Sequence, residues 1–318
     1  MRIVFIGTGA IGVPALRSLL ASEEHKVVGV VTQPDKPAGR QQRIEPTPIK
    51  AAIGAGAAPV LQPARIKHAE AVAEIAALAP DVIVVMAYGQ ILPRTVLEIP
   101  RVACLNLHAS LLPRHRGAAP IQAAIAAGDS ASGITVMYMD EGLDTGDILL
   151  QSSLEIAGDE TGGSLHDRLG ELAPAALAKA LEQLRAGNAP RAPQDSAAAT
   201  YSPKLERDHG RIDGKASAEA IERKIRAFDP WPGTFALLAN AADGEQKLKI
   251  FRARALPARE GAVLGKMGSD DDGRLFLATT DGAVSLLEVQ LEGKRRMSAE
   301  EFSRGNAWVK NAAIIPLP

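Results

Sequence analysis

Residues 2–12 read RIVFIGTGAIG, and this stretch decides the fold class. Its first part, 2–6, is apolar without alternation after Arg2, which is typical of a strand buried on both faces. Three glycines follow within the next six residues, and the apolar spacing predicts a helix over 10–21. A buried strand, a glycine turn and a helix in this order predict an α/β fold.

The rest of the first half repeats this alternation of strand and helix. Apolar runs predict strands at 27–31, 81–86, 102–107, 133–139 and 147–151, and helical spacing predicts helices at 47–56, 66–78, 118–127 and 161–185. Because the strand runs lack polar alternation, helices must cover both faces of the sheet. The sequence therefore predicts a Rossmann-like, mainly parallel sheet.

The composition and the hydrophobic pattern change after the long helix expected at 161–185. Residues 187–205 are rich in Ala, Pro and Asn without periodicity, which is typical of a linker. Beyond them, a helix is predicted at 217–227, and Asp-Gly turns separate short apolar runs near 234–238, 247–254, 274–279 and 283–291. We expect an α/β domain at 1–186, a linker at 187–205, and a small barrel or sandwich of about five strands at 206–318.

Composition excludes several classes of protein. The 318 residues are 46% hydrophobic and 23% charged, which is ordinary for a globular chain with a real core. The formal net charge of −1 argues against a nucleic-acid binder that relies on a basic tail. No apolar run approaches the roughly 18 residues that cross a bilayer, and Pro14 and Arg17 interrupt the only stretch that could pass for a signal peptide. We expect a cytoplasmic enzyme without a membrane segment.

The sequence GTGAIG at 7–12 matches the G-x-G-x-x-G pattern of dinucleotide-binding turns. In such turns an acidic residue ends the second strand and binds the adenosine ribose. Here the second predicted strand ends VTQP at 31–34, and Asp35 already falls in a proline-rich loop. We favour a structural turn, and an NAD(P)-dependent oxidoreductase remains the alternative.

A second group of residues points to chemistry. Asn106 and His108 are two positions apart at the end of a predicted strand, so their side chains project from the same face. Asp144 lies between Gly142 and Gly146, in a tight loop that could carry its carboxylate to this pair. An amide donor, an imidazole and a carboxylate suit acyl transfer to an amine, because the amide stabilises an oxyanion and the imidazole moves a proton. Strand capping and turn formation are the structural alternatives for the same residues.

Segment 33–50 inserts a long loop after the second strand, where such connections usually take about 2–6 residues. Lys36, Arg40 and Arg43 make it cationic, so it is either a solvated surface loop or a loop that contacts phosphates. No His-x-x-x-His pattern or carboxylate cluster has metal-ligand spacing, so no metal is expected. The single cysteine, Cys104, lies in an apolar run and is expected to be buried and inert.

Together these motifs resemble the methionyl-tRNA formyltransferase family. NLHASLLPR at 106–114 looks like the signature of enzymes that use 10-formyltetrahydrofolate, and GLDTGD at 142–147 is similar to their second signature. QPDKPAGR at 33–40 and DPWPG at 229–233 are similar to motifs of the member that acts on tRNA. The resemblance covers nearly the whole chain, and it implies the formyltransferase fold followed by an OB-like barrel.

The resemblance implies transfer of the formyl group of 10-formyltetrahydrofolate to the free amino group of initiator methionyl-tRNA, for translation initiation. The amine would attack directly and pass through a tetrahedral intermediate, with Asn106, His108 and Asp144 as the catalytic set. The OB-like domain would contact the tRNA, and we expect a monomer. The remaining roles that the resemblance implies are folate binding by Ser110, Leu111, Leu112 and Pro113, and tRNA binding by Lys36, Arg40 and Arg43.

Two positions depart from the family pattern. Members usually begin the first turn Gly-Thr-Pro, whereas this chain has Gly9, and this difference creates the dinucleotide-like motif. His115 stands where members commonly have Trp, so a packing contact is expected to differ there. Two further readings of the chain remain open: a formyltransferase that acts on another amine, and a non-enzymatic RNA-binding protein that uses the small barrel alone.

Overall fold

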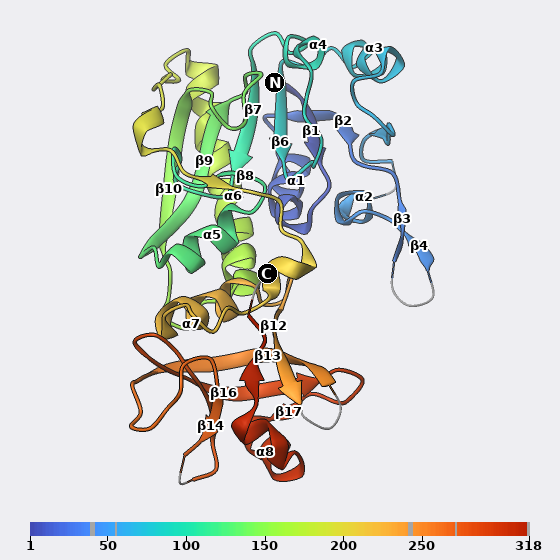
Figure 1. Ribbon diagram of the computed structural model, residues 1–318. Coiled ribbons are helices and arrows are strands. Elements are labelled where there is room, and N and C mark those ends of the chain that lie inside the picture. Colours follow the sequence, from blue (N-terminus) through green and yellow to red (C-terminus); the bar gives the residue numbers. More distant parts are fainter. Residues whose placement is uncertain (39–41, 55, 241–243, 271, 317–318) are drawn as a thin grey trace. The chain divides into compact units, whose positions relative to one another are not determined.

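The computed structural model describes residues 1–38, 42–54, 56–240, 244–270 and 272–316 (Figure 1). Within this part, the chain forms two compact units, each built from separate stretches of sequence. The first unit contains Met1–Pro120, Ala131–Glu155 and His166–Pro203, and the second contains Ile121–Ser130, Ile156–Leu165 and Lys204–Pro318. The domain limits expected from composition, 1–186 and 206–318, stay a prediction.

A seven-stranded sheet forms the centre of the first unit, in the order β10-β9-β7-β6-β1-β2-β5. Its strands are β1 (Arg2–Gly7), β2 (Lys26–Val31), β5 (Val60–Leu61), β6 (Val82–Met86), β7 (Ala103–His108), β9 (Ala131–Tyr138) and β10 (Ile148–Glu155). Five neighbouring strands are parallel, in the order β7-β6-β1-β2-β5. In contrast, β9 runs antiparallel to both β7 and β10. The prediction of a mainly parallel, Rossmann-like sheet is confirmed.

The inner strands β1, β2 and β6 are covered on both faces, as their unbroken apolar sequences require, whereas exposure alternates along the edge strand β10. On one face, Val4 packs in a cluster that includes Ile75. On the other face, Gly12 leaves room for the side chains of Phe5 and Ile49. The helices of this unit are η1 (Ala10–Gly12), α1 (Val13–Leu20), α2 (Pro48–Ala52), α3 (Ala69–Ala77), α4 (Arg94–Leu97) and η2 (Ser196–Ala198). Two more helices, α5 (Pro120–Ala127) and α6 (Gly162–Ala186), each contain residues of both units.

Two pairs of very short strands complete the first unit. The segment expected to be a long loop at 33–50 contains an antiparallel hairpin, β3 (Lys36–Ala38) and β4 (Arg43–Glu45) (Figure 1). In addition, β8 (Arg116–Gly117) pairs in parallel with β11 (Tyr201–Ser202). The sequence does not predict these strands, because two or three residues carry no measurable periodicity.

The second unit contains an antiparallel sheet in the order β14-β15-β16-β13-β12-β18, with β17 paired to β16. Its strands are β12 (Thr234–Asn240), β13 (Gly244–Pro257), β14 (Met267–Ser269), β15 (Leu275–Ala278), β16 (Gly282–Leu291), β17 (Met297–Ser298) and β18 (Ala313–Ile314). The two edge strands are joined by an antiparallel bridge between Lys266 and Ala313. Hydrogen bonds of 2.8 Å from Met267 N to Ala312 O and from Ile314 N to Gly265 O accompany the bridge. These bonds close the sheet into the expected OB-like barrel.

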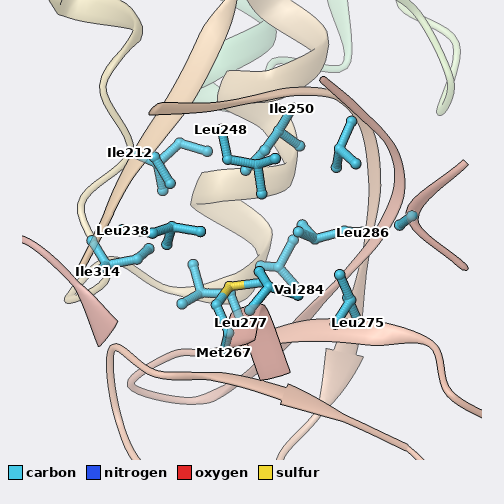
Figure 2. Packing of buried hydrophobic residues seen from close by; sticks show 14 of the residues in the cluster. Ile212, Leu238, Leu248, Ile250, Met267, Leu275, Leu277, Val284, Leu286 and Ile314 are labelled. Carbon is cyan, nitrogen blue, oxygen red and sulfur yellow. The ribbon is translucent and has the colours of Figure 1, made fainter. Parts of the chain in front are cut away.

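The core of the barrel consists mainly of branched aliphatic side chains, and Met267 belongs to the same cluster (Figure 2). Helix α7 (Ala218–Ala227) adds Ile221 and Ile225, which lie one turn apart on its buried face. Ser217 caps this helix by accepting a hydrogen bond from Ala220 N at 3.2 Å. The remaining helices of the unit are η3 (Arg207–Gly210), α8 (Ala299–Gly305) and η4 (Ala307–Asn311). Among the described residues, no helix has the length and apolar character needed to cross a bilayer.

Candidate active site

Alternation along β7 places Asn106 and His108 on one face of the parallel sheet. Cys104, on the same side of the strand, belongs to the apolar cluster that covers this face. Asn106 is the register partner of Val85 on β6, another member of that cluster. The two polar side chains therefore continue an apolar surface toward the carboxyl end of β7. The side chain of His108 is only 6% exposed, so its ring nitrogens depend on protein groups as partners.

The loop between β9 and β10 carries Asp144 back to the end of β7. Asp140 holds this loop, because its carboxylate accepts hydrogen bonds from Gly142 N at 3.0 Å and from Thr145 Oγ1 at 2.8 Å. A Cβ atom at Gly142 would overlap Thr145, and one at Gly146 would overlap the backbone of β9. The two glycines beside Asp144 are therefore required by close packing of the loop, in agreement with the tight turn expected from the sequence.

Asp144 connects the two other candidate residues. Its backbone has a φ of 53°, a left-handed conformation that Asp tolerates better than most residues. Oδ1 accepts a hydrogen bond from Asn106 Nδ2 at 3.3 Å, and Oδ2 accepts one from Gly117 N at 2.8 Å. Oδ2 also lies 3.6 Å from His108 Nδ1, a distance that suits a charge contact rather than a hydrogen bond. The structure thus brings Asn106, His108 and Asp144 together.

The other nitrogen of the imidazole determines which protons His108 can carry. His108 Nε2 lies 2.9 Å from the carbonyl oxygen of His115. Because a carbonyl oxygen only accepts, Nε2 must hold a hydrogen in this arrangement, and Nδ1 faces the carboxylate of Asp144. A second proton, taken up at Nδ1, would point toward Oδ2. In this arrangement Nδ1 is the ring nitrogen of His108 that can take up a further proton, on the side of the ring that faces Asp144.

His115, where the chain departs from the family pattern, supports His108 through its backbone. Its φ of 58° is again left-handed, and its carbonyl oxygen is the partner of the His108 ring. Its amide nitrogen donates to Thr200 Oγ1 at 2.8 Å. The ring of His115 is buried, with Nδ1 at 3.4 Å from the same hydroxyl. The contact with the catalytic candidate is made by the main chain, so it does not depend on the identity of this side chain.

The segment 110–113 is tied to the sheet by Thr135 of β9. The fully buried hydroxyl of Thr135 donates to Ser110 O at 2.6 Å, and it accepts from Leu112 N at 3.1 Å and from Gln151 Nε2 at 2.9 Å. Gln151 also donates to Leu112 O at 2.9 Å. One hydroxyl with one donor and two acceptor positions is therefore fully used. Thr135 and Gln151 hold this segment in one conformation.

The four residues expected to bind folate differ in access. Ser110 and Leu112 are buried, and Ser110 Oγ donates to the carbonyl oxygen of Arg114 at 2.7 Å. Leu111 and Pro113 are partly exposed. Sequence reasoning did not single out Thr135 or Gln151. The available signal was a Thr inside an otherwise apolar run at 133–139, where a buried hydroxyl needs partners.

Two of the three residues expected to bind tRNA lie on the β3–β4 hairpin. Lys36 and Arg43 are exposed at opposite ends of the hairpin strands, and Lys36 Nζ donates to Gln33 Oε1 at 3.0 Å. Arg40 lies outside the described residues. Both side chains place positive charge on the exposed surface of the hairpin.

The base of the hairpin is held by a polar network around Asp35. Its carboxylate accepts from Lys50 Nζ at 2.6 Å and from Gln62 Nε2 at 2.7 Å. Gln62 also donates to Gln33 O at 3.0 Å and accepts from Lys50 Nζ at 2.8 Å. The hydrogen bonds from Lys50 and then Gln62 lower the pKa of the Asp35 carboxyl. The first residues of the hairpin are therefore anchored, in contrast to the free surface loop that remained possible from sequence.

The glycine motif at 7–12 is used for packing. Thr8 N and Gly9 N donate to Ala87 O at 3.2 and 3.1 Å, so these two amides are already occupied. A Cβ atom at Gly7 would lie 2.8 Å from Met86 O, which explains the glycine without a ligand. In a dinucleotide-binding turn these amides face a pyrophosphate instead. The geometry agrees with a structural turn.

Cys104 is buried, and burial raises the pKa of its thiol to about 12. Its Sγ donates to Met139 Sδ at 3.8 Å, so it is part of the packing behind the site. Among the described residues, no three His, Cys, Asp or Glu side chains are grouped so that they could hold a metal ion.

Comparison with protein families places formyl transferase domains along the chain. A family model described as formyl transferase matches residues 1–181, and one described as the C-terminal domain of formyl transferase matches residues 204–307. A methionyl-tRNA formyltransferase from Marinobacter nauticus is 47% identical over 97% of this chain and 97% of its own length. One from Akkermansia muciniphila is 44% identical over 98% of both chains.

Solved structures share the fold at lower sequence identity. An N-formyltransferase from Helicobacter canadensis, in complex with folinic acid and dTDP-3-aminofucose, has a TM-score of 0.63 and 15% identity. The match covers 93% of this chain and 100% of that one. HypX from Aquifex aeolicus, in complex with tetrahydrofolic acid, has a TM-score of 0.60 and 19% identity over 95% of this chain and 47% of HypX. At these identities the likeness concerns the fold alone.

Proposed function

Because this chain belongs to the methionyl-tRNA formyltransferase family, we propose that it transfers the formyl group of 10-formyltetrahydrofolate to the amino group of initiator methionyl-tRNA. One observation of the site carries the proposal. Asn106, His108 and Asp144 meet at the end of β7, in an arrangement suited to transfer an acyl group to an amine. The attacking group is the amine of the substrate, so no Ser or Cys nucleophile is needed.

Asn106 would stabilise charge on the formyl oxygen. Its Nδ2 carries two hydrogens, of which the contact with Asp144 uses one. The second is free to donate to an oxygen that becomes negative when the amine adds to the formyl carbon. The bond to Asp144 keeps the amide from rotating, so this donor is held in place before the reaction begins. Preorganised donors of this kind typically contribute about 2.7–4 kcal/mol to transition-state stabilisation.

His108 and Asp144 would handle the proton. The amine must be neutral to attack, and it must lose a proton after the new C–N bond forms. His108 can take that proton at Nδ1, because Nε2 already donates to the carbonyl of His115. The charged ring then faces Asp144 Oδ2 at 3.6 Å. With the assistance of the Asp144 carboxylate, which faces Nδ1, a proton would then pass to the departing folate nitrogen as its bond to the formyl carbon breaks, which leaves the site as it began.

The formyl donor supplies the one-carbon group, and the residues beside the site fit a folate. Leu111 and Pro113 are the accessible members of segment 110–113, and they offer apolar surface in the segment that follows β7. Ser110 and Leu112 would act as the scaffold, through Thr135 and Gln151. The complexes of the two structural neighbours with folate compounds support a folate as the formyl donor.

The tRNA would be bound in part by the cationic hairpin. Lys36 and Arg43 are exposed on strands whose base is anchored by Asp35, so they present positive charge in a defined place. Arg40, between them in the sequence, is proposed to take part on the basis of the resemblance alone. Relatives of nearly full length that act on methionyl-tRNA support this acceptor over another amine. A monomeric state and a cytoplasmic location stay predictions.

The test supplies the protein with 10-formyltetrahydrofolate and initiator methionyl-tRNA and measures N-formylmethionine after the ester is hydrolysed. A dTDP-linked amino sugar serves as the competing acceptor, and NADH binding is measured in parallel. We expect formylation of the tRNA and no formylation of the sugar. Formyl transfer to the sugar alone, or saturable NADH binding without formyl transfer, contradicts the proposal.

Combined replacement of Lys36 and Arg43 by Ala should raise KM for the tRNA and reduce the salt dependence of that KM.

A further inference from the structure

Gln194 uses both ends of its amide to bridge two segments of the first unit. It lies in the stretch 187–205, whose composition is typical of a linker. Its Oε1 accepts from Arg116 Nε at 3.0 Å and from Arg116 Nη2 at 2.8 Å. Its Nε2 donates to Asp144 O at 2.9 Å and to Gly146 O at 2.8 Å. Four hydrogen bonds from one half-buried side chain thus join β8 to the loop that carries Asp144.

The chemistry of the partners leaves one orientation for this amide. A guanidinium only donates, so the atom facing Arg116 must be the oxygen of Gln194. The nitrogen then faces two carbonyl oxygens, which only accept. Arg116 is 2% exposed, and within the described residues its guanidinium has hydrogen bonds only with Gln194. Arg116 therefore donates two hydrogen bonds to the neutral amide of Gln194 and holds that side chain in place.

The same bridge reaches Asp144 from two directions. Gln194 holds the carbonyl of Asp144, whose backbone φ of 53° is left-handed. Gly117, the residue after Arg116, donates its amide to Asp144 Oδ2 at 2.8 Å. Pairing of β8 with β11 fixes Arg116 and Gly117, since Arg116 N donates to Thr200 O at 2.8 Å. The main chain and the carboxylate of Asp144 are therefore positioned by one continuous set of bonds.

We propose that Gln194, supported by Arg116, is a positioning residue that sets the carboxylate of Asp144 against Asn106 and His108. This inference rests on the proposed function. Gln194 has no described contact with Asn106 or His108, so its effect on the reaction passes through Asp144. A displacement of about 1 Å in a reacting group can cost about 100-fold in rate, so loss of the bridge has a large expected effect on kcat.

The first test uses Gln194→Ala and Gln194→Glu. Alanine removes the whole bridge, whereas glutamate keeps a partner for Arg116 but has no N–H for the two carbonyls. We expect both to lower kcat by about 10- to 100-fold with KM for either substrate changed less than about threefold. The matched control is Asp195→Asn, an exposed neighbour whose carboxylate accepts a hydrogen bond from Ala197 N and so caps η2. Unchanged kcat in both Gln194 variants, or a change confined to KM, overturns the inference.

A double-variant cycle separates positioning from general damage. If Gln194 acts through the Asp144 carboxylate, Gln194→Ala should add little to the loss that Asp144→Asn already causes. If the bridge only stabilises the unit, the two losses should multiply. Urea unfolding of each variant reports on stability, and Gln194→Glu serves where Gln194→Ala proves too unstable to assay.

A readout without turnover distinguishes failure of this inference from failure of the proposed function. Gly117 N–H and the side-chain amide of Asn106 both donate to Asp144, so their NMR proton shifts report where the carboxylate lies. We expect both signals to move in Gln194→Ala and to stay in Asp195→Asn. Signals that stay in both variants refute the positioning role even if the wild-type enzyme transfers formyl groups. Signals that move in a protein without formyl transfer support it while rejecting the proposed reaction.

Discussion

Gly117 donates its backbone N–H to Oδ2 of Asp144 at 2.8 Å, and this bond sets the direction of the carboxylate. A main-chain donor in a paired strand cannot rotate away, unlike a side chain. Oδ1 is left for Asn106, and the second side of Oδ2 faces His108. The carboxylate of Asp144 is thus oriented by a main-chain donor that lies outside the proposed catalytic set.

Replacement of Asn106 by Ala should lower the single-turnover rate of formyl transfer by about 100- to 1000-fold. The reason is the loss of a preorganised donor for the developing oxyanion. His108→Ala should lower the rate by a comparable or larger factor, because the proton acceptor is lost. Rapid-quench measurement with saturating substrates checks both. Asn188→Ala, the same substitution at an exposed position, is the control, and near-normal rates for Asn106→Ala and His108→Ala would falsify the scheme.

Asp144→Asn should lower kcat by about 100-fold or more, with little change in KM. The substitution keeps the shape of the side chain but removes the negative charge that faces His108 at 3.6 Å. It also places an NH2 group against either Asn106 or Gly117, both of which donate. Steady-state kinetics provides the measurement, with Glu141→Gln in the same loop as the control. A kcat within about threefold of the wild type is incompatible with this role.

Thr135→Val should disturb the proposed folate segment and the stability of the first unit. The substitution removes the Thr135 hydroxyl. Three groups then lose a hydrogen bond that they make in the wild type: Ser110 O, Leu112 N and Gln151 Nε2. An unsatisfied buried group costs about 1–3 kcal/mol, so urea unfolding should show a loss of at least that size. KM for the formyl donor should rise. Thr135→Ser keeps the hydroxyl and should restore KM; equal effects of Val and Ser would exclude the hydrogen-bond explanation.

Asp35 should make the stability of the first unit depend on pH. Hydrogen bonds from Lys50 and Gln62 lower its pKa in the folded state below the ordinary value of 3.8. The stabilisation is therefore present above the unfolded pKa and is lost as the pH falls through the lower, folded pKa. The difference in unfolding free energy between wild type and Asp35→Asn should be constant from about pH 7 to about pH 5 and shrink below it. Urea titrations across this range provide the measurement.

The control for that titration is Asp159→Asn, at an exposed carboxylate of the second unit. The difference in unfolding free energy between wild type and Asp159→Asn should be close to zero at every pH. If the difference in unfolding free energy between wild type and Asp35→Asn grows as the pH falls below about pH 4, its pH dependence has the opposite sign. That result would rule out the hydrogen bonds to Asp35 as the cause of the pH dependence.

Cys104 should react slowly with thiol reagents in the folded protein. Burial raises the pKa of the thiol to about 12, and only the thiolate is a good nucleophile. At about pH 8, iodoacetamide should label the native protein far more slowly than the urea-unfolded protein, in which the cysteine has an ordinary thiol pKa of about 8.5. Mass spectrometry of timed samples measures both rates. Equal labelling rates would show that the apolar cluster around Cys104 is readily exposed to solvent in the folded protein, and would contradict the prediction.

Several elements follow from local sequence pattern alone. The apolar run at 2–6 becomes β1 (Arg2–Gly7), and the spacing at 217–227 becomes α7 (Ala218–Ala227). The two-residue spacing of Asn106 and His108 places them on one face, because a strand has a period of two. Each of these outcomes depends on residues a few positions apart, so steric rules and burial of one face suffice to predict them.

Other features depend on contacts between distant residues. The sequence could show that Gly142 and Gly146 flank Asp144, but the meeting of its carboxylate with Gly117 and Asn106 follows from the path of the whole loop. The short strands β8 and β11 have no pattern of their own, and they exist because each supplies the hydrogen bonds of the other. In the same way, the bridge between Lys266 and Ala313 closes the barrel between segments 47 positions apart.

Patterns of neighbouring residues were enough to predict the fold class and the chemical groups of the candidate site: an amide, an imidazole and a carboxylate. Tertiary structure alone decided that these groups share one carboxylate-centred network, and that Gln194, in a stretch typical of a linker, holds the loop of Asp144. The physical reason is that apolar burial is encoded in neighbouring residues. The pairing of a buried donor with a distant acceptor, by contrast, is settled only when the folded chain brings the two together.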